Sequence, residues 1–143
     1  MAEFGARPDS RGATPRRRPV KTLFDTSVLI EHLRGDERAT SLLQSVPTGE
    51  RLASVLTRIE LEGGMRSGER QQVASLLGVL TLLPVTDAVA RRAGEHLRRC
   101  RRSHPGIDLV DYAIGATAEL NDAELATLNT RHFPMFKDIQ APW

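Results

Sequence analysis

Four short apolar segments, separated by stretches of helical character, constrain the fold of this chain most strongly. They lie near residues 20–25, 51–56, 80–85 and 123–128, and each is too short to be a helix of ordinary length. Strands that alternate with helices pair in parallel, because each helical crossover returns the chain to the same end of the sheet. The pattern therefore predicts an α/β fold with a central, mainly parallel sheet flanked by helices.

Length and composition are typical of one globular domain. The chain has 143 residues, 40% hydrophobic and 27% charged, and no apolar run reaches the roughly 18 residues that a membrane span needs. The single cysteine, Cys100, excludes an internal disulfide and a cysteine-based zinc site. We therefore expect a cytoplasmic protein that does not bind membranes.

The start of the chain differs from the rest in charge. The first twenty residues hold five arginines against two acids, whereas from Lys21 onward 15 basic residues accompany 16 acidic ones. Residues 1–19 are rich in Arg, Pro, Gly and Ser and show no apolar periodicity, so they bury too little surface to offset the entropy cost of folding. We expect a disordered basic tail at 1–19 and a single folded domain at 20–143.

Polar residues mark the expected helix starts. Asp36 is the predicted N-cap of one helix, and Thr86 is the predicted N-cap of a long helix over 87–102. Between them, Thr57 would cap another helix, with Glu60 three residues later as in a capping box.

Three acids stand where a strand ends or a helix begins. Asp25 follows the first apolar segment, Glu60 comes shortly after the second, and Asp111 lies near the start of a helix predicted over 108–120. Helix capping would explain Glu60, and also Asp111 together with Asp108. At the mouth of a parallel sheet, however, the three acids would repel one another unless a cation neutralised them. Their oxygen atoms suit Mg²⁺ or Mn²⁺, and the residues alone leave capping and metal binding both open.

The last two predicted helices differ in composition. One side of the helix over 87–102 is apolar, and the other carries arginines that would either meet phosphates or form a solvated surface. These are Arg91, Arg92, Arg98, Arg99, Arg101 and Arg102. The helix over 108–120 carries small side chains that would let its backbone lie close to the sheet and hold Asp111 firmly; they are Ala113, Gly115, Ala116, Thr117 and Ala118.

Four segments in order resemble the PIN-domain ribonucleases, specifically the VapC-type toxins of bacterial toxin–antitoxin pairs. They are residues 24–30, 54–63, 107–118 and 127–133, and the similarity spans about residues 20–137. The resemblance implies a PIN-like three-layer sandwich and a metal-dependent endoribonuclease that cleaves structured RNA such as tRNA or rRNA.

The resemblance also assigns roles to the acids. Asp25 and Asp111 would be the ligands of Mg²⁺ or Mn²⁺, and Glu60 would bind the metal through water or orient the attacking water. The family's fourth acidic position falls on Asn129, whose amide would hydrogen-bond water, and Asp108 would supply the missing charge.

Two hydroxyl groups accompany these acids. Ser27 and Thr127 would orient Asp25 and its neighbours, or they would simply satisfy backbone groups at the strand ends. The four histidines show no close metal-ligand spacing, and each is expected to be structural or exposed; they are His32, His96, His104 and His132.

Partners follow from the same resemblance. The chain would form a homodimer and would be neutralised by a VapB-type antitoxin whose tail enters the acidic groove. Candidate apolar surfaces for that antitoxin surround Val28, Leu29 and Leu33, and Leu61 and Met65, although packing in the core would explain many of the same residues.

Two other functions remain open at this stage. A catalytically inactive PIN-like module that binds RNA or protein would also tolerate Asn129 at the fourth position. A phosphatase with Asp25 as its nucleophile is disfavoured, because the second acid expected two residues later is replaced by Ser27.

Overall fold

The computed structural model describes residues 20–143, so the tail expected at 1–19 lies outside the described residues. The strands are β2 (Thr22–Phe24), β3 (Arg51–Ser54), β4 (Thr81–Leu83) and β5 (Glu124–Ala126). The helices are α1 (Thr26–Leu33), α2 (Glu37–Ser45), α3 (Val55–Gly64), α4 (Arg70–Gly78), α5 (Asp87–Cys100) and α6 (Leu109–Leu120). Short 3₁₀ turns cover Thr48–Glu50, Ser67–Glu69 and Thr130–His132. In the described part of the chain, no helix combines the length and apolar character needed to cross a membrane.

The four strands form one parallel sheet in the order β4-β3-β2-β5. In its register, Leu23 of β2 lies opposite Leu52 of β3 on one side and Leu125 of β5 on the other. All four predicted strand segments are present, each shorter than expected, and the predicted parallel pairing is confirmed. Because the strands are parallel, their carboxyl ends meet at one edge of the sheet.

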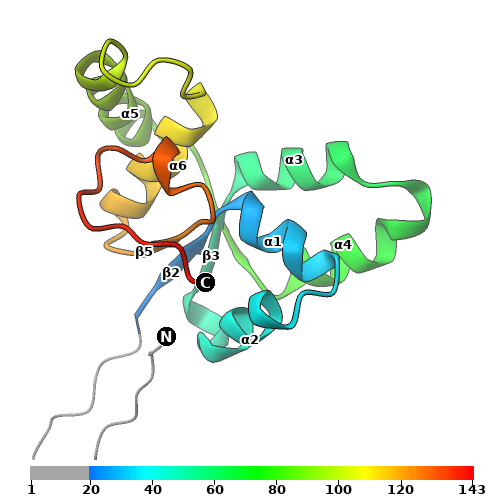
Figure 1. Cartoon of the computed structure of the whole chain (residues 1–143). Helices are drawn as coiled ribbons and strands as arrows, with labels where there is room; N and C mark the ends of the chain where they lie inside the picture. The colour runs from blue at the N-terminus through cyan, green and yellow to red at the C-terminus, as the bar shows by residue number, and fades with distance from the viewer. Residues whose placement is uncertain (1–19) are drawn as a thin grey trace, which may run out of the picture.

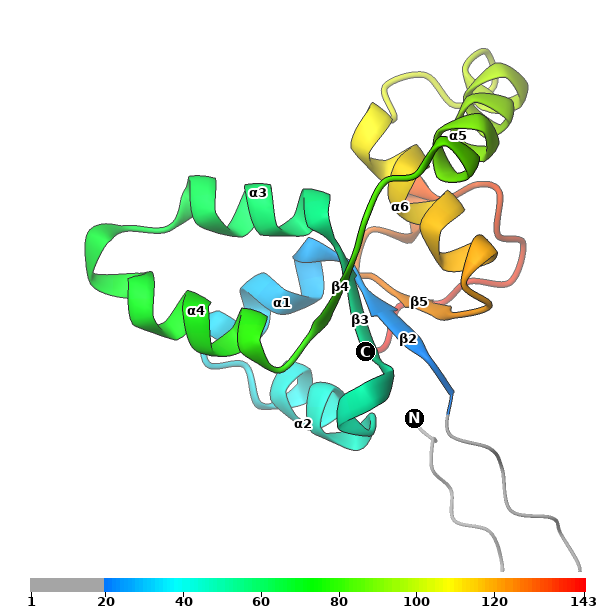
Figure 2. The same ribbon diagram turned by 180° about the vertical axis from the view of Figure 1, so that it is seen from behind.

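The sheet separates two hydrophobic cores, which gives the three-layer sandwich that was expected. Helices α1 to α4 cover one face, and α5 and α6 cover the other (Figures 1 and 2). Phe24 packs into the core under α1 to α4, whereas its neighbour Leu23 packs against Ile114 of α6 and Phe133. Alternate side chains of β2 thus fill opposite cores, and each buried side chain of this size contributes about 1.5–3 kcal/mol.

Two of the three predicted helix caps are confirmed. The side chains of Asp36 and Thr86 accept backbone N–H groups in the first turns of α2 and α5. The prediction for Thr57 was wrong: α3 begins at Val55, and the hydroxyl of Ser54 caps it. The chain passes from β3 into α3 with no intervening loop, which places Thr57 inside the helix, where it is fully buried.

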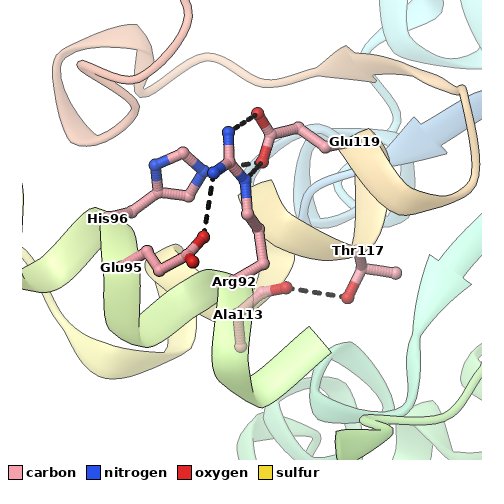
Figure 3. A network of polar contacts seen from close by, with 6 residues as sticks. All are labelled: Arg92, Glu95, His96, Ala113, Thr117 and Glu119. Carbon is pink, nitrogen blue, oxygen red and sulfur yellow. Dashed lines mark hydrogen bonds and ion pairs between the residues drawn. The ribbon is translucent and has the colours of Figure 1, made fainter. Parts of the chain in front are cut away.

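Helix α5 is fixed to α6 by a polar network (Figure 3). Arg92 donates from Nε and Nη2 to Glu119 of α6 at 3.0 and 3.2 Å, and from Nη1 to Glu95 at 2.9 Å. His96 is only 3% exposed, and its Nε2 lies 2.6 Å from Oε1 of the same Glu119. Of the two alternatives left open for the arginines, Arg92 therefore follows the one in which they pair with local acids, because it bonds to Glu95 and Glu119.

Candidate active site

The residues predicted for the site gather around one hollow at the carboxyl edge of the sheet. Its volume is about 570 Å³, and its lining includes Asp25, Glu60, Asp108, Asp111 and Asn129. Asp25 comes directly after β2 and Asn129 three residues after β5, while α3 and α6 carry the other acids. Residues more than 100 positions apart in the chain thus line one space, as the strand-end argument predicted.

Asp25 is buried and held by two hydroxyl groups. The residue is only 4% exposed, and its Oδ2 accepts hydrogen bonds from the hydroxyl groups of Ser27 at 3.0 Å and of Thr127 at 2.7 Å. Although Asp25 occupies the N-cap position of α1, its carboxylate makes no capping bond. Among the described residues Oδ1 accepts no hydrogen bond, so one oxygen is fixed in place while the other is available to a ligand.

Ser27 and Thr127 perform both of the roles left open by the sequence. Besides donating to Asp25, their hydroxyl oxygens accept the backbone N–H groups of Leu128 and Asn129, each at 3.0 Å. These bonds tie the start of α1 to the segment after β5. The orientation of Asp25 is therefore set by two distant parts of the chain.

Asp111 lies in the first turn of α6 and contacts His132. The distance from Nδ1 of His132 to Oδ2 of Asp111 is 3.0 Å. Burial raises the pKa of the Asp111 carboxyl to about 6; the charge of His132 opposes this rise, and the charges of Asp25 and Asp108 add to it. The carboxylates are therefore close enough to repel, the condition under which a cation is favourable.

His132 was missed as a site residue because the sequence offered no metal-ligand spacing for it. The signal that could have found it is its position shortly after the end of β5, three residues after Asn129.

Glu60 enters the hollow from α3 and is exposed. Its Oε1 accepts a hydrogen bond of 2.6 Å from Thr26, which also lies 3.1 Å from the buried hydroxyl of Thr57. Glu60 is therefore not part of a capping box with Thr57. The residues Thr26 and Thr57 instead connect the starts of α1 and α3 beneath the Glu60 carboxylate.

Asn129 and Asp108 are both exposed on the rim of the hollow. Asp108 is at the N-cap position of α6, but its side chain makes no capping bond. Both side chains are thus placed where water or a ligand in the hollow can reach them.

The donors in the hollow fit a small hard cation. Within residues 20–143, no three side chains of His, Cys, Asp or Glu converge as a ready-made metal site. Mg²⁺ does not need one, since it is usually held by one or two carboxylates and keeps several waters or substrate phosphate oxygens. Asp25 and Asp111 are the two carboxylates that best meet this requirement.

Two other hollows adjoin the same helices. A larger one of about 750 Å³ lies between α1, α2 and α4, but no carboxylate lines it, so it lacks the chemistry of the acidic hollow. A groove of about 370 Å³ between α1, α3 and α4 is lined by apolar residues, among them Leu33, Leu61 and Met65, and by charged ones. It shares Ile30, Arg34 and Glu60 with the acidic hollow. Val28 and Leu29 follow the other alternative, packing in the core, because both are fully buried.

Comparison with known proteins gives consistent results. The family model described as "PIN domain" matches residues 22–139. Ribonuclease VapC10 of Mycobacterium tuberculosis is 49% identical over 122 residues, which cover 85% of this chain and 92% of that protein. Ribonuclease VapC19 of the same species is 45% identical over 123 residues, 85% of this chain and 98% of that protein. A solved toxin–antitoxin complex from Klebsiella pneumoniae contains a chain with 27% identity and a TM-score of 0.71, over 85% of this chain and 98% of that one.

Proposed function

The chain belongs to the PIN-domain family and, within it, to the VapC-type ribonuclease toxins, and we propose that it cleaves structured RNA in a reaction that depends on Mg²⁺ or Mn²⁺. The observation that carries the metal requirement is that Asp25 and Asp111 line the same hollow. Burial and, after it, the charges of Asp25 and Asp108 raise the pKa of Asp111, so a cation there would relieve the repulsion. A tRNA or an rRNA is the proposed substrate class.

Each residue of the hollow has a role in this proposal. Asp25 and Asp111 hold the cation, with Asp25 oriented by its two hydroxyl donors and Asp111 by His132. When bound, the cation would neutralise charge on the scissile phosphate and acidify the water that attacks phosphorus. Glu60 and Asn129 would orient that water, and the exposed Glu60 carboxylate can take its proton as the bond from the water oxygen to phosphorus forms. The bond from phosphorus to the ribose oxygen then breaks, and the ribose oxygen takes a proton from solvent.

The neutralising partner is proposed to be a VapB-type antitoxin. The groove that contains Leu33, Leu61 and Met65 is continuous with the acidic hollow, because both are lined by Ile30, Arg34 and Glu60. A segment seated there could extend a cationic side chain toward the carboxylates and compete with the metal. A homodimer and a cytoplasmic location complete the proposal.

The test is cleavage by purified protein. We expect the chain to cleave bulk bacterial tRNA with Mg²⁺, to stop on chelation, and to lose activity on Asp25→Asn. The control is Asp122→Asn, which also removes one charge, because Asp122 is exposed and its φ of 52° suits asparagine. Full activity of Asp25→Asn, or equal loss in both variants, would contradict the proposal.

Mapping RNA 5′ ends after brief induction would identify the substrate. One discrete set of cuts in cells expressing the wild-type chain, missing in cells expressing Asp25→Asn, would define the RNA and the cleaved bond. Cuts shared by both strains would come from other nucleases.

A second candidate is a catalytically inactive module that binds RNA or protein. Asn129 at the fourth acidic position favours it. Cleavage that requires both a divalent cation and Asp25 would exclude this candidate.

A further inference from the structure

The arginines of α5 and of the turn after it fall into two groups. Arg91 pairs with Asp87 at 2.8 Å, and Arg92 is used by the network with Glu119. The remaining four form no ion pair within the described part of the chain, and all are exposed. They are Arg98, Arg99, Arg101 and Arg102, and we refer to them as the α5-end arginines.

Helix stabilisation does not account for all four. Cations in the last turn of a helix interact favourably with its dipole, but the effect fades within that turn. Arg98 and Arg99 lie in the last turn of α5 and Arg101 is its C-cap, whereas Arg102 lies beyond the helix. Four exposed cations in five residues therefore need a further explanation.

The α5-end arginines are followed closely in the sequence by residues that line the acidic hollow. The turn after α5 leads through Gly106, whose φ of +90° reverses the chain, to Asp108; both residues line the hollow. In both ribbon views this turn joins α5 to the start of α6, the helix that carries Asp111 (Figures 1 and 2). A further exposed cation, Arg131, lies in the sequence between Asn129 and His132, which both line the hollow.

Helix α5 is fixed firmly enough to keep this placement. Glu119 of α6 holds both Arg92 and the buried His96 (Figure 3). Cys100, one turn after His96 on α5, is buried as well. The end of α5 therefore keeps its position relative to Asp111.

We propose that the α5-end arginines form a phosphate-binding subsite that holds the RNA backbone beside the bond cleaved in the acidic hollow. The inference rests on the proposed function. Guanidinium groups bind phosphate oxygens through paired hydrogen bonds, and the acidic hollow alone would repel a polyanion. The chain has one tryptophan and one tyrosine, so contacts to phosphates rather than stacking on aromatic side chains would supply most of the affinity.

Binding is tested with two variants that lose the same charge. Arg101→Gln with Arg102→Gln removes two α5-end arginines, and Arg38→Gln with Arg70→Gln removes two exposed arginines of α2 and α4, on the other face of the sheet. Both pairs are made in the Asp25→Asn background, and the probe is bulk bacterial tRNA. We expect about tenfold weaker binding for the α5-end pair. The slope of the logarithm of the binding constant against the logarithm of the salt concentration should also become less steep, by about 0.7 for each lost phosphate contact.

Cleavage by the active chains provides the second readout. For the α5-end pair we expect KM for tRNA to rise about tenfold with kcat unchanged, because the arginines act in binding and lie outside the acidic hollow. Unchanged thermal unfolding shows that the variant is folded, and the pair Arg98→Gln with Arg99→Gln repeats the test from the preceding turn.

The outcomes separate this inference from the proposed function. Equal tRNA affinity of the α5-end and control pairs overturns the subsite even if tRNA is cleaved. Weaker binding by the α5-end pair supports the subsite even if no chain cleaves tRNA, a result that would count against the proposed function alone. Loss of antitoxin binding with unchanged tRNA affinity also overturns the subsite, since the arginines would then serve a protein partner.

Discussion

Helices α5 and α6 lie side by side on one face of the sheet, yet they contact solvent in opposite ways. Half of the twelve residues of α6 are buried, against three of the fourteen in α5. The buried helix carries Asp111, whereas the exposed helix ends in four arginines without ion pairs among the described residues. A single charge that must be positioned accurately is thus placed on a packed element, while several charges that attract a polyanion are placed in solvent.

Burial of α6 has a cost for Asp111. Burial and the neighbouring charges of Asp25 and Asp108 raise its pKa to about 6, so its ionised form is less stable in the folded chain than in the unfolded one. Active sites often retain such unfavourable charges because function requires them. On α5, by contrast, the arginines are exposed and incur no comparable cost.

The largest expected effect comes from Asp111→Asn. RNA cleavage should fall by about a thousandfold, because loss of a metal ligand removes several kcal/mol of transition-state stabilisation. Stability in metal-free buffer at pH 7–8 should instead rise by about 1–2 kcal/mol, since a raised carboxyl pKa means that ionisation opposes folding. Urea unfolding and a cleavage assay on one preparation measure both. A variant that loses activity by unfolding would refute the assignment of Asp111 to function rather than structure.

Removing the anchor between the helices should have the next largest effect. Glu119→Ala leaves the buried His96 without its acceptor and the partly buried Arg92 with only the exposed Glu95, and should cost about 2–3 kcal/mol in the free energy of unfolding. Glu95→Ala is the matched control: Glu95 also contacts Arg92, at 2.9 Å, but its side chain is 63% exposed and should cost under about 1 kcal/mol. Equal midpoints in urea for the two variants would show that α5 is not anchored through Glu119.

The same anchor should weaken in acid. Burial alone would raise the pKa of Glu119, but the hydrogen bonds from Arg92 and His96 outweigh it, and the net pKa is lowered. A lowered carboxyl pKa stabilises the fold above the unfolded value of about 4.3, and this stabilisation is lost as pH falls through the folded value. The stability difference between the wild type and Glu119→Gln should therefore shrink from pH 6 to pH 3, as measured by urea unfolding. A constant difference would mean that the ionised form of Glu119 is not what anchors α5.

The sequence predicted the residues of the acidic hollow well, because their meeting depends only on the topology of the sheet. A parallel sheet brings the residues after its strands together whatever their separation along the chain, and this applied to Asp25 and Asn129. The capping prediction for Thr57 was wrong because the apolar run of β3 continues into α3, so no change in pattern marked the junction at Ser54.

The partners of the histidines could not be predicted in the same way. His96 of α5 contacts Glu119 of α6, and His132 of the 3₁₀ turn after β5 contacts Asp111 of α6. Each pair depends on how separate elements pack, and no short-range spacing in the sequence encodes it. The small residues of α6 show a similar limit, since Gly115 faces Met135 and Phe133 of the C-terminal segment rather than the sheet alone.

The smallest expected effects on the free energy of unfolding come from replacing one glycine by alanine in each of the two helices. A Cβ added at Gly94 of α5 meets nothing within 4 Å, so Gly94→Ala should stabilise the fold by about 0.8–1.0 kcal/mol through helix propensity. A Cβ added at Gly115 of α6 would lie 3.3 Å from Sδ of Met135 and 3.5 Å from Cδ1 of Phe133. Because the neighbours must shift, most of the propensity gain should disappear and Gly115→Ala should be about neutral. Urea unfolding of both variants gives the comparison, and an equal gain at Gly115 would mean that the C-terminal segment does not pack tightly on α6.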